Sequence, residues 1–223
     1  GPGSLVLIGG RGCGKSSICR RIAAVDKRWT LLPLDSLIVY EARGASIADI
    51  VKREGWHGFR DLEYEVTRKA ASFGDWGLVD AGGGVVVDLS EDGQEVFSER
   101  KVEALRANAK VVYIRRPVEY LEGRIEKKAA RARAEGLEGD SNRPALSATA
   151  GFREIMERRG PWYEQAAHLV VDGHEGGSAR PKEDIAAEVL QWWFDVSGAQ
   201  GVSNKQAGKE ARSYAKLLGL LLC

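Results

Sequence analysis

Residues 5–16 read Leu-Val-Leu-Ile-Gly-Gly-Arg-Gly-Cys-Gly-Lys-Ser, an apolar run of strand length followed directly by a glycine-rich loop. The loop, residues 9–16, matches the pattern G-x-x-x-x-G-K-[ST], and residues 17–25 continue as a helical run. Glycines in such a loop let backbone amides reach phosphate oxygens, and the following helix presents its positive end to them. The stretch therefore predicts an α/β domain that binds the phosphates of a nucleotide.

Two side chains of this loop have expected chemical roles. Lys15 is expected to bridge the β- and γ-phosphates of ATP, and the Ser16 hydroxyl to ligate Mg²⁺. The residues expected to contact ATP here are Gly10, Gly12, Cys13, Gly14, Lys15, Ser16 and Ser17. Cys13 and Cys19 are otherwise expected to be packing residues rather than redox centres. The loop alone fits GTPases, ATPases, nucleotide kinases and small-molecule kinases, so the acceptor side has to decide among them.

Further apolar runs of strand length follow the first one, with helical stretches between them. They are residues 30–34, 77–81, 111–114 and 169–171. Because each run is continuously apolar rather than alternating, both faces of each strand are expected to be buried. This pattern indicates a mainly parallel sheet covered by helices, which is an α/β layered fold.

The segments between the strands carry helical signals. Residues 46–49 read as the capping box of a short helix, and the next helix has an apolar stripe meant to face the core. That stripe consists of Phe59, Leu62, Val66, Ala70 and Phe73. A helix marked by Val118, Leu121 and Ile125 is expected to give way from Lys127 to a mobile flap of dense charge. Residues 184–196 predict a terminal helix.

Composition excludes several classes of protein. The chain has 223 residues, 43% of them hydrophobic and 29% charged, which fits one compact domain with or without an appendage. With 33 Lys and Arg against 32 Asp and Glu, the net charge is +1, and no basic, aromatic stripe offers a surface for nucleic acid. Three cysteines without zinc-like spacing indicate a reducing compartment. We therefore expect a cytoplasmic protein without nucleic-acid or membrane partners, although a removed organelle-targeting peptide would leave no trace.

Several segments together resemble the shikimate kinase family. They are the loop at 9–16, Gly-Trp-His-Gly-Phe-Arg-Asp-Leu-Glu at 55–63, the glycines at 82–84, Arg-Pro-Ala-Leu at 143–146, and Arg-Gly-Pro-Trp-Tyr-Glu-Gln-Ala at 159–166. Their spelling is closest to the kinase domain of the fungal pentafunctional aromatic-pathway polypeptide. The resemblance implies a five-stranded parallel sheet in the order 2-3-1-4-5 with a mobile lid, as in nucleoside monophosphate kinases. It also implies ATP-dependent phosphorylation of the 3-hydroxyl of shikimate.

The acceptor of such a reaction is a small carboxylic acid, and the chain offers groups to bind it. A guanidinium grips a planar carboxylate through two parallel hydrogen bonds, so two arginines from separate segments would fix its orientation. Arg60 and Arg159 are the candidates, although Arg159 could instead belong to a basic helix end with Arg153 and Arg158. Gly82, Gly83 and Gly84 are expected to line the acceptor pocket, because a ligand can contact backbone amides directly where side chains are absent.

The sequence departs from the family where shikimate kinases carry Asp-x-Asp at the end of the second strand. Counting back from Gly44 places Leu34 and Ser36 at the acidic positions, whereas a shift of one residue places Pro33 and Asp35 there. In either register the aspartate on the metal side is missing. A misplaced Mg²⁺ could slow phosphoryl transfer by several powers of ten, so the metal needs another carboxylate.

Asp80, at the end of the third strand, stands where other enzymes with this loop keep a metal-binding carboxylate. We therefore assign the Mg²⁺ site to Ser16 and Asp80, and expect Asp35 to orient the acceptor hydroxyl or act as its base. The family resemblance further implies that Arg143 closes over the γ-phosphate from a lid at about residues 127–146, and that Arg124 stacks on adenine. Lys15, Asp35 and Arg143 are thus the expected catalytic residues.

Two alternative functions remain open at this point. A catalytically silent sensor of a shikimate-like or quinate-like acid would explain the missing Asp-x-Asp, and a kinase for another hydroxy acid such as gluconate would share the loop. Residues 1–4 resemble a cloning remnant, residues 5–196 the kinase-like domain, and residues 197–223 a linker with an extra helix. A homodimer or a longer parent polypeptide is also compatible with the sequence.

Overall fold

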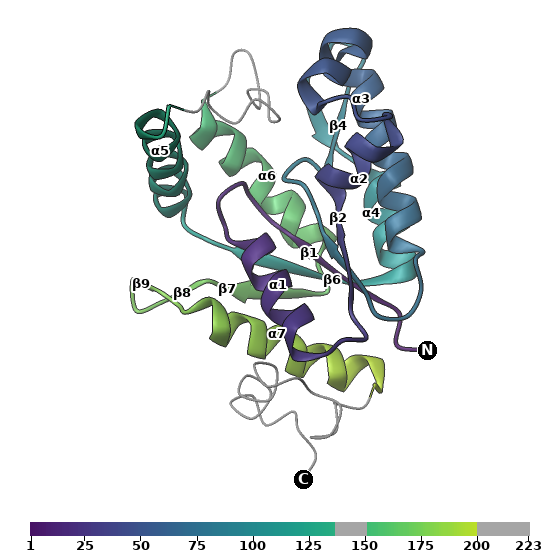
Figure 1. The fold of residues 1–223 in the computed structure, drawn as a ribbon, viewed down its shortest axis with the longest axis vertical. Coiled ribbons are helices and arrows are strands. Elements are labelled where there is room, and N and C mark those ends of the chain that lie inside the picture. The colour runs from purple at the N-terminus through teal and green to yellow at the C-terminus, as the bar shows by residue number, and fades with distance from the viewer. Residues whose placement is uncertain (137–150, 200–223) are drawn as a thin grey trace.

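The computed structural model describes residues 1–136 and 151–199, and its centre is a parallel sheet (Figure 1). The strand order is β2-β3-β1-β6-β7. The strands are β1 (Ser4–Ile8), β2 (Thr30–Pro33), β3 (Gly77–Asp80), β6 (Ala109–Arg115) and β7 (Leu169–Asp172). Because β6 and β7 are the fourth and fifth strands of this sheet, the predicted order 2-3-1-4-5 is confirmed. The first strand begins at Ser4, whose hydroxyl donates to the Gly74 carbonyl, so the fold includes one residue assigned from sequence to a terminal remnant.

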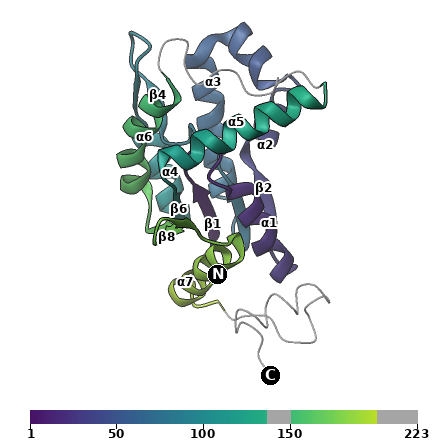
Figure 2. The same cartoon turned by 90° about the vertical axis from the view of Figure 1, so that its left-hand side faces the viewer.

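Helices cover both faces of the sheet (Figures 1 and 2). They are α1 (Lys15–Val25), α2 (Leu34–Glu41), α3 (Ile47–Ala71), α4 (Glu99–Asn108), α5 (Val118–Ala134), α6 (Phe152–Ala166) and α7 (Lys182–Ser197). Successive residues of a strand point to opposite faces, so Leu5 and Leu7 pack with α1 and α7, and Val6 and Ile8 pack with α3. The prediction of burial on both faces is confirmed for the inner strands β1, β3 and β6. It is wrong for β2, none of whose residues is buried, and for most of β7, because these two strands are the edges of the sheet.

Helix α3 joins the two helices expected from sequence. The Ser46 hydroxyl accepts a hydrogen bond from the Asp49 amide, which confirms the predicted cap. The chain then leaves helical geometry at Gly55, where φ is 71°, a conformation that glycine adopts without strain. The predicted stripe is right for Phe59, Val66 and Ala70 but wrong for Phe73, whose side chain is 51% exposed. Phe73 lies two residues beyond the end of α3, so the helical spacing no longer directs it inward.

Two short hairpins stand outside the main sheet and were not predicted. The first pairs β4 (Val87–Leu89) with β5 (Glu95–Phe97), and the second pairs β8 (His174–Glu175) with β9 (Ser178–Ala179). Gly93, with φ of 80°, closes the turn of the first hairpin. Asp92-Gly93 is a typical hairpin-turn dipeptide, so a sequence signal for it existed.

Helix α5 is longer than expected. It runs to Ala134, so the segment from Lys127 that was read as the start of a mobile flap is helical over its first two turns. Alanine and long charged side chains have high helix propensity, and this outweighs the shortage of apolar anchors. Among the described helices, none has a stretch both long enough and apolar enough to cross a bilayer.

Candidate active site at the carboxyl edge of the sheet

The glycine loop after β1 has the backbone conformation that a phosphate loop needs. Gly9, Gly12 and Gly14 have φ values of 144°, 90° and 100°, where a residue with a side chain would be strained. The Cys13 amide donates to the Gly10 carbonyl at 3.2 Å, which closes a tight turn. Gly14 is the N-cap of α1, so the positive end of that helix faces the loop. The loop therefore has the turn and the helix N-terminus that phosphate binding requires.

Lys15 is folded back over this loop. Its Nζ donates to the carbonyls of Gly9 at 2.7 Å and Gly10 at 3.3 Å, and only 8% of the residue is exposed. Burial by itself lowers the pKa of Lys15, but the charge interactions with Cys13 and Asp80 raise it above its usual value. Lys15 thus stays a cation beside the loop. Ser16 is exposed at the first turn of α1, as a ligand-binding hydroxyl requires.

More cations flank the loop. A β-carbon built at Gly12 would lie 3.5 Å from Arg124 Cβ, so Arg124 on α5 lies beside the loop, and its stacking on adenine stays a prediction. A β-carbon built at Gly14 would lie 3.3 Å from Lys182 Cε. Burial, together with Arg124 and Arg21, lowers the pKa of Lys182. Lys182 was not predicted as a site residue, because α7 and the loop are far apart along the chain.

The thiols near the loop behave as packing groups. Cys13 and Cys19 are both free and buried. Burial, with the charge of Asp80 second, raises the pKa of the Cys19 thiol well above its usual range. A thiol that does not ionise is a poor nucleophile, which agrees with the packing role predicted for Cys19.

The segment Gly82 to Gly84 lies between the phosphate loop and the helices α2 and α3. A β-carbon at Gly82 would lie 3.0 Å from Asp35 Oδ1, one at Gly83 would lie 3.6 Å from the Arg11 amide nitrogen, and one at Gly84 would lie 2.2 Å from Arg60 Nη1. The three glycines therefore bring the loop, Asp35 and Arg60 to one place. At Gly84 the missing side chain makes room for a guanidinium, a reason the sequence did not reveal.

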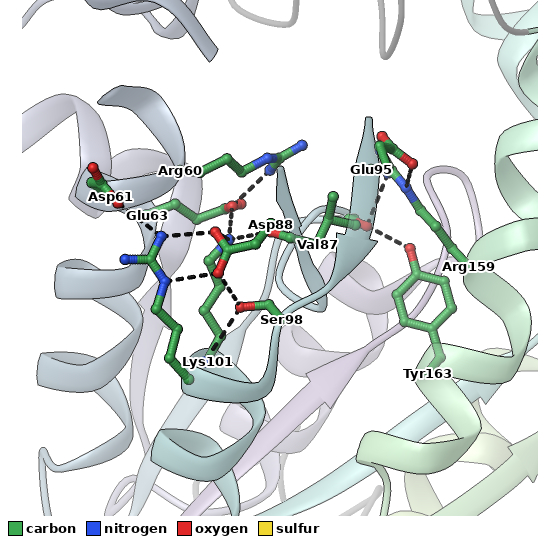
Figure 3. Close-up of polar contacts among 12 residues, drawn as sticks. Arg60, Asp61, Glu63, Val87, Asp88, Glu95, Ser98, Lys101, Arg159 and Tyr163 are labelled. Carbon is green, nitrogen blue, oxygen red and sulfur yellow. Dashed lines mark hydrogen bonds and ion pairs between the residues drawn. The ribbon is translucent and has the colours of Figure 1, made fainter. Parts of the chain in front are cut away.

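Arg60 is buried on α3 and held by a carboxylate (Figure 3). Its Nη1 donates to Glu63 Oε2 at 2.6 Å, whereas its buried Nε finds no hydrogen-bond acceptor within the part of the chain that is described. The fully buried Lys101 also donates to Glu63 Oε2, at 2.7 Å. Burial raises the pKa of Glu63, but Lys101 and Arg60 more than offset this and bring it to about 2. Glu63 is therefore an anion that fixes Arg60.

Arg159 approaches the same place from α6 (Figure 3). The residue is fully buried, and its Nη1 donates to the Gly83 carbonyl at 3.1 Å. Tyr163, one turn further along α6, donates its hydroxyl to the same carbonyl. Glu95 of the first hairpin binds Nε of Arg159 at 3.1 Å and also accepts from Nη2. Arg159 is thus a built part of the site and not an exposed basic helix end.

The two candidate aspartates occupy different edges of the site. Asp35 lies in the first turn of α2 and reaches Gly82, while Leu34 beside it is buried in the core. Of the two registers left open, the one with Asp35 as the acidic residue matches this geometry. Asp80 ends β3 opposite Leu7 of β1, and its charge raises the pKa of both Lys15 and Cys19. Asp80 is therefore near the phosphate loop and Asp35 near the glycine segment at residues 82–84.

Arg143 lies outside the described residues, as does the part of the expected lid from residue 137 onward. Ser17 Oγ accepts from Arg21 Nη1, so its side chain has a partner within α1. No role in the site was predicted from sequence for Glu95, Lys101 or Tyr163. Lys101 lies with Val102 and Leu105 on the buried side of α4. A lysine on an otherwise apolar helix face is the sequence signal that could have identified it as a buried, functional residue.

The chain is similar in sequence to known proteins over most of its length. The family model described as "Shikimate kinase" matches residues 11–193. Shikimate kinase from Leptospira biflexa is 36% identical over 189 residues, which cover 85% of this chain and 94% of the relative. Shikimate kinase from Pseudomonas entomophila is 32% identical over 192 residues, which cover 84% and 94%.

Solved structures give the same result. A structure of shikimate kinase from Acinetobacter baumannii in complex with shikimate superposes with a TM-score of 0.65 at 25% identity, covering 87% of this chain and 94% of that one. Shikimate kinase from Aquifex aeolicus has a TM-score of 0.62 at 21% identity, with 88% and 99% covered, and supports the fold. The finer likeness to the fungal pentafunctional polypeptide stays a prediction. By its matched residues, its relatives and its fold, this chain belongs to the shikimate kinase family.

Proposed function

We propose that this chain transfers the γ-phosphoryl group of ATP to the 3-hydroxyl of shikimate. One observation carries the proposal: two buried guanidinium groups, Arg60 from α3 and Arg159 from α6, lie at the glycine segment that also contacts the phosphate loop. A triphosphate on the loop and a small carboxylic acid held by the arginines would then face each other across residues 82–84.

The carboxylate of shikimate would bind the two guanidinium groups. The Nε of Arg60 is buried without an acceptor among the described residues, and leaving such a donor unpaired is costly. A carboxylate oxygen satisfies it and gains a charge-assisted hydrogen bond. Orientation of the acid by two cations from different helices also sets the position of its hydroxyl groups, which is what in-line transfer requires.

Asp35 would orient the 3-hydroxyl and accept its proton. It is the acidic side chain that reaches the glycine segment from α2. Lys15 and Arg124 would stabilise the negative charge on the triphosphate, because both lie at the loop and Lys15 remains cationic. Electrostatic stabilisation of this kind supplies most of the catalysis in phosphoryl transfer.

Mg²⁺ is proposed as the companion of ATP. Its protein ligands would be the Ser16 hydroxyl and, through water, the Asp80 carboxylate, and hard oxygen donors of this kind are those that Mg²⁺ prefers. Within residues 1–136 and 151–199 no cluster of three or more acidic, histidine or cysteine side chains offers a complete protein-only metal site. This fits a metal held mainly by phosphate oxygens. Bound there, Mg²⁺ would neutralise charge on the β- and γ-phosphates.

A coupled ADP-release assay tests the proposal. The wild-type chain and Lys15→Ala are assayed with ATP, Mg²⁺ and shikimate, and in parallel with quinate and gluconate. We expect acceptor-dependent ADP release that is highest for shikimate and absent in Lys15→Ala. Tight shikimate binding without turnover would indicate a sensor instead of an enzyme, and preference for gluconate would change the acceptor. ADP release without any acceptor measures background ATPase activity and is subtracted.

A further inference from the structure

The hairpin of β4 and β5 connects the two helices that carry the acceptor arginines. On β4, Asp88 binds Arg100 through Nε at 2.7 Å and the Ser98 hydroxyl at 2.8 Å, which ties the hairpin to the start of α4. On β5, Glu95 binds Arg159 of α6. Phe97, two residues along the same strand and so on the same face, lies with its ring centroid 6.5 Å from that of Trp162 of α6. The hairpin therefore contacts both the start of α4, next to α3, and helix α6 (Figure 3).

Glu95 fixes the orientation of the Arg159 guanidinium. Its two oxygens accept from Nε and Nη2, while the Gly83 carbonyl accepts from Nη1. A guanidinium has five N–H donors, and the contacts with Glu95 and Gly83 use three of them. The Tyr163 hydroxyl also interacts with this buried guanidinium. Arg158 Nε also lies 3.4 Å from Glu95 Oε2, so two cations share this carboxylate. A side-on pair of this kind stops the planar fork from rotating.

The arrangement repeats at the second arginine. Glu63 accepts from Nη1 of Arg60, whose buried Nε has no hydrogen-bond acceptor among the described residues. Glu95 accepts from Nε and Nη2 of Arg159 in a similar way. In each case a buried carboxylate balances most of the charge, which lowers the cost of keeping a guanidinium out of water. Glu63 lies on the same helix as Arg60, whereas Glu95 comes from a hairpin 64 residues away from Arg159.

From these contacts we infer that Glu95 is a positioning residue: the β4–β5 hairpin uses its carboxylate to orient Arg159 for the carboxylate of the acceptor. The inference rests on the proposed function, because it assigns Arg159 to that carboxylate. It goes further by making the hairpin part of the acceptor site. Glu95 itself does not contact the acceptor and acts only through Arg159.

The test measures binding directly, by calorimetry, in the full chain. Wild type, Glu95→Gln, Glu95→Ala and Glu95→Asp are titrated with shikimate, with methyl shikimate and with a non-hydrolysable ATP analogue. Glu91→Gln, which removes a negative charge from the exposed turn of the same hairpin, is the matched control. Thermal unfolding of each variant shows whether it is folded, and Glu95→Gln keeps the volume of the side chain in case Glu95→Ala does not fold.

We expect Glu95→Gln and Glu95→Ala to weaken shikimate binding about tenfold or more, since a charge-assisted pair that orients the fork is lost. Binding of the ATP analogue should stay within about twofold, Glu95→Asp should recover part of the loss, and Glu91→Gln should bind like wild type. Methyl shikimate, which lacks the carboxylate charge, should lose much less affinity than shikimate. A general structural defect would not produce this selective loss.

Two results would overturn the inference. Unchanged shikimate affinity in the folded Glu95→Gln would show that the carboxylate does not matter for Arg159. Tighter shikimate binding would show that Glu95 competes with the acceptor for Arg159 rather than orienting it. Failure of the wild-type chain to bind shikimate at all would be a failure of the proposed function, and it is distinguished by the wild-type titration alone.

Discussion

The guanidinium of Arg60 occupies the space where Gly84 would carry a side chain, because a β-carbon built at Gly84 would lie 2.2 Å from Arg60 Nη1. No backbone strain is involved, since Gly84 does not have a positive φ. The glycine is needed at this position for the approach of Arg60, which in turn is fixed by Glu63. The proposed acceptor site therefore depends on a contact between two segments that are distant along the chain.

Gly84→Ala should weaken acceptor binding selectively. The added methyl group would displace the Arg60 guanidinium, so we expect KM for shikimate to rise about tenfold or more while KM for ATP stays nearly constant. Steady-state kinetics with each substrate varied in turn measures both. Gly123→Ala on α5 is the control, because nothing lies within 4 Å of the position its β-carbon would take. Equal KM values for shikimate in the two variants would contradict this account of Gly84.

Lys15→Met should remove catalysis while the fold persists. The substitution keeps an apolar side chain of similar length but deletes the cation that lies against the Gly9 and Gly10 carbonyls. We expect kcat to fall about a hundredfold or more, as for other losses of a preorganised cationic or hydrogen-bonding group. Coupled ADP release measures kcat, and circular dichroism checks the fold. Lys27→Met, a change at an exposed lysine, should leave kcat unaltered.

Asp80→Asn should act on the metal. If Asp80 supports Mg²⁺ near the loop, the concentration of Mg²⁺ needed for half-maximal turnover should rise about tenfold or more. Turnover measured against Mg²⁺ at fixed ATP and shikimate gives this value. A Mg²⁺ dependence identical to that of wild type would remove Asp80 from the metal role.

Asp35→Asn should act on the acceptor instead. Loss of the base would lower kcat about a hundredfold while the Mg²⁺ requirement stays the same. The two aspartate variants are controls for each other, since each neutralises one carboxylate at the site. Comparable Mg²⁺ shifts in both variants would contradict the separate roles assigned to Asp35 and Asp80.

The free energy of unfolding should fall in acid because of Glu63. Its pKa is about 2 in the folded chain against an ordinary value of 4.5, so the charged form is favoured by folding. The stabilisation is present above pH 4.5 and is lost as the pH falls toward 2. Its size is on the order of 3–4 kcal/mol, from a shift of about 2.5 pKa units at about 1.4 kcal/mol for each unit.

Urea unfolding at pH 5 and pH 3 measures this effect. The difference in free energy of unfolding between the two pH values should be smaller in Glu63→Gln than in wild type, because the variant has no carboxyl group to protonate. Glu65→Gln, an exposed neighbour on the same helix, should behave like wild type. An equal pH dependence in Glu63→Gln and wild type would show that another group is responsible.

Local patterns predicted the elements that depend on neighbours in sequence. The phosphate loop, the five strands of the sheet and the Ser46 cap were all readable, because a turn, an apolar strand or a cap is decided within a few residues. The order of the strands came from the family resemblance. Local patterns misled at Phe73 and at Lys127, since neither the end of α3 nor the full length of α5 is marked by a single residue.

By itself, the sequence determined that this is a phosphate-loop α/β protein of a kinase family with arginines available for an acidic acceptor. Only the tertiary structure decided how those arginines are held: Glu95 reaches Arg159 from a hairpin, Lys101 neutralises Glu63 from α4, and Gly84 yields space to Arg60. The physical reason is that a buried charge is stable only beside a counter-charge, and the partner can come from any part of the chain that folding brings close. No periodicity in the sequence records such a pairing.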